Sequence, residues 1–117
     1  PSAVLSLSAT DDRIAIDHRG GDPIDVAAVT VRVSVDGEPL AEQPPVPFFS
    51  TAGFEPGPTG PFNSGADSKW SVGEVASFTI SDANAPVPET GDRVTVEVIR
   101  DGRPVAQVRT TVSGGGD

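Results

Sequence analysis

The stretch AVTVRVSV, from Ala28 to Val35, alternates valine with alanine, threonine, arginine and serine. Because a β-strand points successive side chains to opposite faces, this pattern places four valines on one face and polar groups on the other. The pair Asp36-Gly37 follows directly, and Asp-Gly is typical of a tight β-hairpin turn. The stretch therefore predicts a half-buried strand that turns back into a short edge segment.

Alternation of the same kind recurs along the chain. The further runs are Ala3–Ala9, Arg13–Arg19, Glu74–Ile80, Arg93–Ile99 and Pro104–Val112. Turn signals separate them, among them Asp11-Asp12 and a second Asp-Gly pair at Asp101-Gly102. About seven short strands at a spacing of roughly ten residues are typical of a two-sheet sandwich. The fold expected is an all-β, immunoglobulin-like antiparallel sandwich, without the cysteine pair of antibody domains.

Residues 43–67 break the pattern, since they are rich in proline and glycine and hold four of the five phenylalanines. The four are Phe48, Phe49, Phe54 and Phe62. Proline removes a ladder donor, so this segment is expected to form a long ordered loop in a single domain of residues 1–112. Its aromatic rings are expected to contact a neighbouring subunit or, as the alternative, to cover this domain's own core. Residues 113–117, SGGGD, are expected to form a flexible tail.

The charge balance restricts the partners. Seventeen acidic residues face eight basic ones, of which only Lys69 is a lysine, so the net charge is −9. Such a surface repels phosphate groups, which excludes nucleic acid and anionic lipid headgroups as expected partners. Scarce lysine and abundant aspartate favour adaptation to high salt, where screening shortens the range of carboxylate repulsion. The absence of cysteine excludes disulfides and thiolate chemistry.

The segment HRGGDPID, from His18 to Asp25, contains the only histidine and is the first candidate for chemistry. No serine lies in a G-x-S-x-G nucleophile elbow, and one histidine without cysteine is a poor basis for a zinc site. We therefore expect no enzyme activity and no cofactor. His18, Gly20, Gly21 and Asp22 are expected to form a structural turn at a strand end, with positive φ at both glycines.

A second candidate lies between Asn63 and Glu74, where oxygen ligands are loosely spaced like those of a calcium loop. The residues are Asn63, Asp67 and Glu74, with Ser71 between them. The loop lacks a glycine at the sixth position and has Lys69 in its middle, so it is a weak calcium candidate. Trp70 nearby is expected to be a half-buried tryptophan of the core, and the alternative is an exposed ring that stacks on a sugar. These features leave open a secreted calcium- or carbohydrate-binding sandwich module as the alternative function.

The ordered set of motifs resembles a known family. The segments LSATDDRIAIDHRGGDPID, VTVRVSVDGEPL, PPVPFFSTAGFEPGPTGPFN and WSVGEVASFTI resemble, in that order, the extracellular domain of haloarchaeal type IV pilin-like proteins. The resemblance covers nearly the whole chain. It implies the head domain of a structural subunit in a pilus-like cell-surface filament, which mediates subunit packing and adhesion. The implied partners are copies of itself or related pilins, with membrane contact only through an N-terminal apolar helix that this stretch of sequence does not contain.

Overall fold

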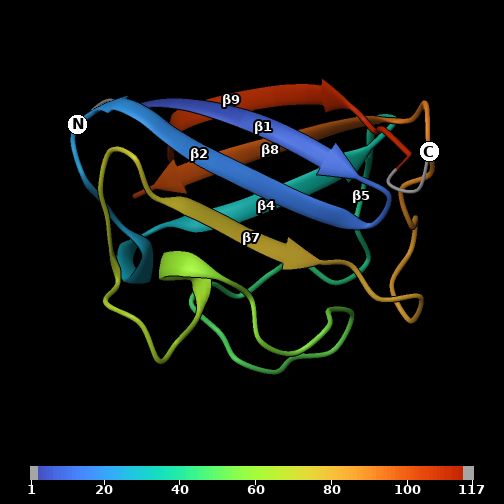
Figure 1. Cartoon of the computed structure of the whole chain (residues 1–117), viewed down its shortest axis with the longest axis horizontal. Coiled ribbons are helices and arrows are strands. Elements are labelled where there is room, and N and C mark those ends of the chain that lie inside the picture. The colour runs from blue at the N-terminus through green and yellow to red at the C-terminus, as the bar shows by residue number, and fades with distance from the viewer. Residues whose placement is uncertain (1–2, 115–117) are drawn as a thin grey trace.

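Two antiparallel sheets pack face to face in the computed structural model, which describes residues 3–114 (Figure 1). One sheet has the order β1-β2-β7, from strands Ala3–Thr10, Arg13–Gly21 and Val75–Thr79. The other has the order β5-β4-β8-β9, from Glu38–Pro39, Thr30–Val35, Arg93–Arg100 and Arg103–Thr111. The chain crosses between the sheets after β2, β5 and β7, which gives an immunoglobulin-like Greek key. The all-β sandwich expected from the alternating pattern is confirmed.

Short elements close one end of the sandwich. The strands β3 (Ile24–Asp25) and β6 (Lys69–Trp70) form a separate two-stranded ladder. Two 3-10 turns accompany them, η1 at Val26–Ala28 and η2 at Gly60–Phe62. Alternation does not predict any of these elements, because two or three residues are too few to show a period.

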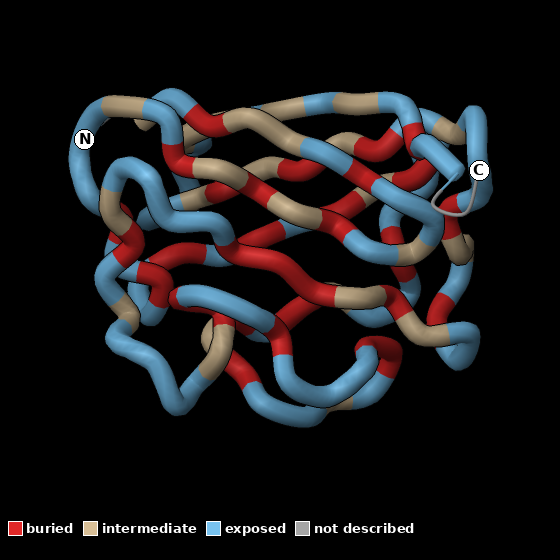
Figure 2. The backbone as a smooth tube through the Cα atoms, viewed as in Figure 1, coloured by how far each residue is buried: buried red, intermediate tan, exposed pale blue. Residues whose placement is uncertain are grey.

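The core lies between the two sheets and follows the alternation. Val31, Val33 and Val35 of β4 pair in register with Val98, Val96 and Val94 of β8, and all six are buried. Ile14 and Ile16 of β2 face them from the other sheet, also fully buried. In Figure 2, buried positions accordingly alternate with intermediate or exposed ones along these strands. Burial of one face of each strand is what stabilises the sandwich.

Both Asp-Gly pairs form the hairpin turns that the sequence predicts. Asp36 and Gly37 have φ values of 51° and 83°, and Asp101 and Gly102 have 52° and 76°. Positive φ at both central residues is the type I′ geometry, whose twist matches that of the flanking strands. These turns join β4 to β5 and β8 to β9.

The end of β9 ties the two sheets together. The Ser113 amide donates to the Ala9 carbonyl at 2.9 Å, and the Asp11 amide donates to the Ser113 carbonyl at 2.9 Å. Strands β1 and β9 therefore lie beside each other across the sandwich edge (Figure 1). The prediction that residues 113–117 form a flexible tail is wrong for Ser113. This residue is part of the fold, because both its backbone amide and its carbonyl are hydrogen-bonded. Residues 115–117 lie outside the described residues.

At the opposite edge of the four-stranded sheet, a side chain continues the ladder where β5 ends. Gln43 accepts from the Val33 amide through Oε1 at 2.7 Å and donates to the Val33 carbonyl through Nε2 at 3.0 Å. The same carbonyl accepts from the Leu40 amide at 3.0 Å. The Gln43 amide thus imitates a strand partner for β4, since it offers one acceptor and one donor.

Candidate functional site

The long loop, residues 43–67, is the region that the sequence singled out for a contact with a partner, and it runs along the free edge of β7. Thr59 pairs with Ser77, and Phe54 pairs with Ile80, as isolated antiparallel bridges. The Thr59 amide donates to the Ser77 carbonyl at 2.9 Å, and the two hydroxyl groups also hydrogen-bond. The loop therefore acts as an irregular outer strand, which satisfies an edge that would otherwise expose unpaired backbone groups.

Gly60 allows the closest approach of this loop to the sheet. Its φ is +66°, and a Cβ atom added there would lie 2.2 Å from the Val75 carbonyl oxygen. Any side chain at this position would displace the loop or the strand, because no real Cβ contact is that short. The glycine is thus required for the loop to cover β7.

Three of the four loop phenylalanines pack inside the domain. Phe48, Phe54 and Phe62 are buried, and they form a chain of ring contacts with Phe78 and Trp70 at centroid distances of 5.3–6.0 Å. For these three rings, the alternative that they cover the domain's own core is therefore confirmed. The predicted subunit contact is wrong for them, because buried rings cannot reach a neighbour. The sequence could not distinguish these three rings from Phe49, because buried and exposed positions do not alternate regularly along the loop.

Phe49 differs from the other three. Its ring is 59% exposed, although Phe48 beside it is buried. Its backbone is held in place, because the Gly57 amide donates to the Phe49 carbonyl at 2.8 Å. An exposed aromatic ring on an ordered loop loses little conformational freedom on binding. Of the predicted interface residues, Phe49 is the one that the fold leaves accessible.

His18 is fully buried and forms a corner with Trp70. Its Nε2 lies 2.8 Å from the Asp22 carbonyl oxygen, which only accepts, so Nε2 carries the proton. Its ring meets the Trp70 indole edge-on at 5.9 Å, and Nδ1 is buried with no hydrogen-bond partner. Neither contact supplies a nucleophile or a carboxylate, so the geometry around His18 is that of a packing residue.

The expected turn at His18 begins later than the sequence suggests. Strand β2 continues through Gly20 and Gly21, which pair with β1, and Arg19 is the extra residue of a β-bulge. Only Gly21 has positive φ, at 92°, and nothing lies within 4 Å of a Cβ placed on Gly20. The prediction of positive φ at Gly20 is wrong, because Gly20 pairs with Val4 within the ladder, and the positive φ falls on Gly21 at the end of the strand. The turn itself lies at Asp22 and Pro23.

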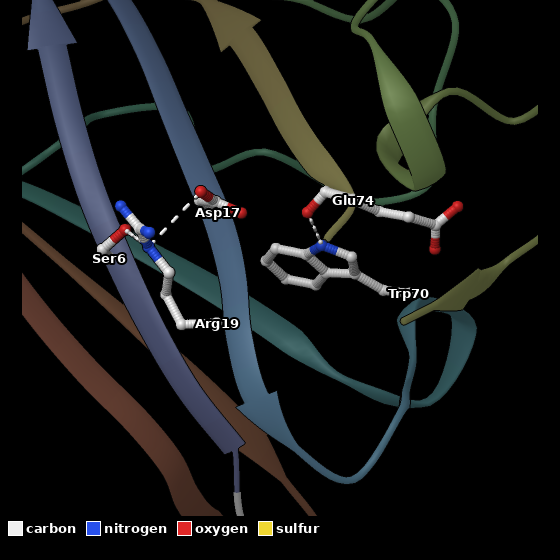
Figure 3. Close-up of polar contacts among 5 residues, drawn as sticks. All are labelled: Ser6, Asp17, Arg19, Trp70 and Glu74. Carbon is white, nitrogen blue, oxygen red and sulfur yellow. Dashed lines mark hydrogen bonds and ion pairs between the residues drawn. The ribbon is translucent and has the colours of Figure 1, made fainter. Parts of the chain in front are cut away.

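Trp70 is closed to a ligand. The indole is fully buried, and its Nε1 donates to the Glu74 carbonyl at 2.9 Å (Figure 3). Stacking on a sugar requires an exposed ring face, so the sugar-stacking alternative at Trp70 is wrong. The expected core tryptophan is confirmed, although its ring is fully rather than half buried. The indole instead anchors the turn of residues 71–74 that leads into β7.

The weak calcium candidate is also not assembled. Oδ1 of Asn63 accepts from the Gly65 amide at 2.8 Å, and Oδ1 of Asp67 accepts from the Lys69 amide at 2.9 Å. Oε1 of Glu74 accepts from the Ser71 amide at 2.7 Å. Each oxygen thus caps its own local turn, as Asx-type side chains commonly do. Among residues 3–114 no group of three or more histidine or acidic side chains is placed to hold a metal ion.

The outer face of the three-stranded sheet carries a small polar network. Arg19 Nε donates to Ser6 Oγ at 3.1 Å and lies 3.4 Å from Asp17 Oδ2 (Figure 3). A hollow of about 350 Å³ beside it is lined by Arg19 and Asp17 and by smaller side chains such as Ser8 and Ala15. The ion pair is largely exposed, so it contributes little to stability. We assign no ligand to this hollow.

Comparison with known proteins gives no relative for this arrangement. The chain matches no protein family, no curated protein and no solved structure. In the part of the chain that the structure describes, no helix is long and apolar enough to cross a membrane.

Basic and acidic residues occupy different parts of the fold, which the net charge alone does not show. All eight basic residues lie in strands. Of the seventeen acidic residues, only Asp17, Asp25, Glu38 and Glu97 lie in a strand of the described chain. Most carboxylates therefore lie in turns and loops, and the guanidinium groups lie in the strands. The sequence contained this signal, because most of the arginines fall within the alternating runs.

Proposed function

We propose that this chain is the head domain of a structural subunit in a type IV pilus-like filament on an archaeal cell surface. It serves subunit packing and adhesion, and it has no enzyme activity. The support from sequence is the ordered set of motifs that resembles the extracellular domain of haloarchaeal pilin-like proteins, together with the acidic, lysine-poor composition.

The observation that supports the proposal most directly is the exposed ring of Phe49. The loop places this aromatic side chain outward while it buries Phe48, Phe54 and Phe62, and hydrogen bonds hold the loop on β7. Aromatic anchors of this kind are enriched at the centres of protein interfaces. A neighbouring subunit is the partner we propose for Phe49. The location is accordingly extracellular, and the partners are copies of this chain or related pilins.

The test is the substitution Phe49→Ser in the complete protein, expressed in the organism that encodes it. We expect surface filaments containing this chain to be lost in electron micrographs, while the melting temperature of the purified domain is unchanged. Val72→Ser is the matched control, since Val72 is similarly exposed at 55% on a different turn. It should leave the filaments intact.

Two outcomes contradict different parts of the proposal. Normal filaments in the Phe49→Ser strain would show that this ring makes no subunit contact. Failure of an antibody against the wild-type chain to label any filament would remove the proposed function itself.

A further inference from the structure

The outer face of the four-stranded sheet is basic in an otherwise acidic protein. Three arginines point outward from it, Arg32, Arg93 and Arg109, against the single carboxylate of Glu97. The remaining outward side chains near its middle are uncharged, such as Ser34, Thr95 and Gln107. The face therefore carries net positive charge, in contrast to the net charge of −9 for the whole chain.

The register places these groups in rows across the sheet. Arg32 lies beside Glu97 and then Gln107, and Ser34 lies beside Thr95 and then Arg109. Between the rows is a shallow hollow of about 190 Å³, lined among others by Arg32, Glu97 and Gln107. Among the described residues, the ion pairs recorded are Arg19–Asp17 and Arg100–Asp101, so the three arginines of this face have no carboxylate partner within 4.0 Å.

Acidic residues gather at one end of the same molecule. Backbone hydrogen bonds bring the turns there together: the Asp92 amide donates to the Glu89 carbonyl, and the Val112 amide donates to the Asp92 carbonyl. The Asp36 amide donates to the Arg93 carbonyl, and the Arg93 amide donates to Asp36 Oδ1 at 2.9 Å, so Arg93 lies where the basic face meets the acidic end. Ser113, the next residue, accepts from the Asp11 amide, so the turn at Asp11-Asp12 lies at this end too. Glu38 follows the Asp36-Gly37 turn and is exposed, as is Glu89. The acidic end thus consists of Asp11, Asp12, Asp36, Glu38, Glu89 and Asp92.

We propose that the basic sheet face binds the acidic end of a second copy of this chain. Guanidinium groups form bidentate hydrogen bonds with carboxylates, so arginine suits such a contact better than lysine does. The two surfaces are different patches of one molecule, which makes the contact heterologous. A heterologous contact that does not close into a ring propagates as an open filament. The inference deepens the proposed function and rests on it, since it names the surfaces through which heads pack in a filament.

Net charge does not prevent this contact in high salt. The molecule extends 34 × 28 × 25 Å, whereas the Debye length in 1 M salt is about 3 Å. Repulsion between the distant carboxylates of two copies is then largely screened, while ion pairs in direct contact are screened much less. In molar salt, association therefore depends on the ion pairs that become partly buried in the contact.

The experiment uses two variants with reversed charge. Arg32→Glu with Arg109→Glu makes the sheet face acidic. Glu38→Arg with Glu89→Arg places two guanidinium groups in the acidic end and lowers its negative charge. Neither glutamate side chain makes a recorded hydrogen bond in the described structure, and both arginines are exposed, so both variants should fold. Sedimentation velocity in about 1 M NaCl, at protein concentrations up to about 1 mM, measures association.

We expect each variant alone to associate at least about tenfold more weakly than the wild-type chain, because like charges then meet in the contact. An equimolar mixture of the two variants should associate more strongly than either variant alone, because the new carboxylates of one variant meet the new guanidinium groups of the other. The control is Arg100→Glu with Arg103→Glu, which makes the same change in net charge beside the Asp101-Gly102 turn. It should associate as the wild type does.

Three results would overturn the proposal. These are wild-type association that is insensitive to both variants, a mixture that associates no more strongly than either variant alone, and a wild-type chain that stays monomeric throughout the concentration range. None of them removes the proposed function, which the filament images of the Phe49→Ser strain test separately. Unchanged melting temperatures of the variants exclude misfolding as the cause of a loss.

Discussion

The valine-rich strands and the long loop both build the core, but they do so by different means. In β4 and β8 the buried positions alternate strictly, so each valine takes its face from its neighbours in sequence. In residues 43–67, Phe48 is buried and Phe49 is exposed, and contacts distant in sequence decide which ring turns inward. Figure 2 shows buried segments in this loop as well as in the strands. A segment without periodicity can thus be as much a part of the core as a strand.

Phe62→Ala should have the largest effect on the free energy of unfolding, and it tests whether the loop is part of the hydrophobic core. Phe62 is fully buried between Trp70 and Phe78, at ring distances of 5.3 and 6.0 Å. Removing its ring should lower the free energy of unfolding by about 3–5 kcal/mol in urea denaturation, because a large cavity remains. A loss below about 1 kcal/mol would mean that the loop only lies on the surface.

Gly60→Ala tests how closely the loop approaches the sheet. The added Cβ meets the Val75 carbonyl and the backbone has positive φ, so we expect a loss of roughly 2–4 kcal/mol in the free energy of unfolding. Gly57→Ala is the control, because its φ is +78° but no atom lies within 4 Å of the new Cβ. It should cost only about 1 kcal/mol from backbone strain. Equal losses in chemical denaturation would contradict the close approach.

Gln43→Ala tests how far strand β4 depends on the first residue of the loop, whose side chain bonds both backbone polar groups of Val33. Its loss leaves the Val33 amide without its acceptor, which should cost about 1–3 kcal/mol in a thermal or urea unfolding experiment. Gln107→Ala, an exposed glutamine on the same sheet, should change stability by less than about 0.5 kcal/mol. If the two variants were equally stable, water would replace the Gln43 amide without penalty.

Phe49→Ser should have the smallest effect on stability. Comparison with Phe48→Ser tests the difference between the exposed ring and the buried ring beside it. Since the ring is mostly exposed, the free energy of unfolding should stay within about 0.5 kcal/mol of the wild type. Phe48→Ser, which buries a hydroxyl and leaves a cavity, should be several kcal/mol less stable. Calorimetric melting of both purified domains distinguishes them. A large loss for Phe49→Ser would show that its ring stabilises the domain rather than remaining available for a partner.

The positions of the strands can be predicted from the sequence, but most details of the candidate sites cannot. The seven strands, their inward faces and both Asp-Gly turns follow from alternation and turn chemistry, which act over a few residues. The calcium candidate at Asn63, Asp67 and Glu74 failed because loose spacing says nothing about where a carboxylate points. Trp70 was open to both interpretations, since a lone aromatic residue beside a turn has no pattern that indicates burial.

By itself, the sequence determined the all-β class, the strand faces, the hairpin turns and the acidic character of the chain. These properties depend on local geometry and on composition. Only the tertiary structure decided that the loop covers β7, that Ser113 joins the two sheets, and that Phe49 alone among the four loop phenylalanines is exposed. It also brought six carboxylates together at one end and placed Arg32, Arg93 and Arg109 on a single face. The reason is physical: such relations arise from hydrogen bonds and packing between residues far apart in the chain, which no short stretch encodes.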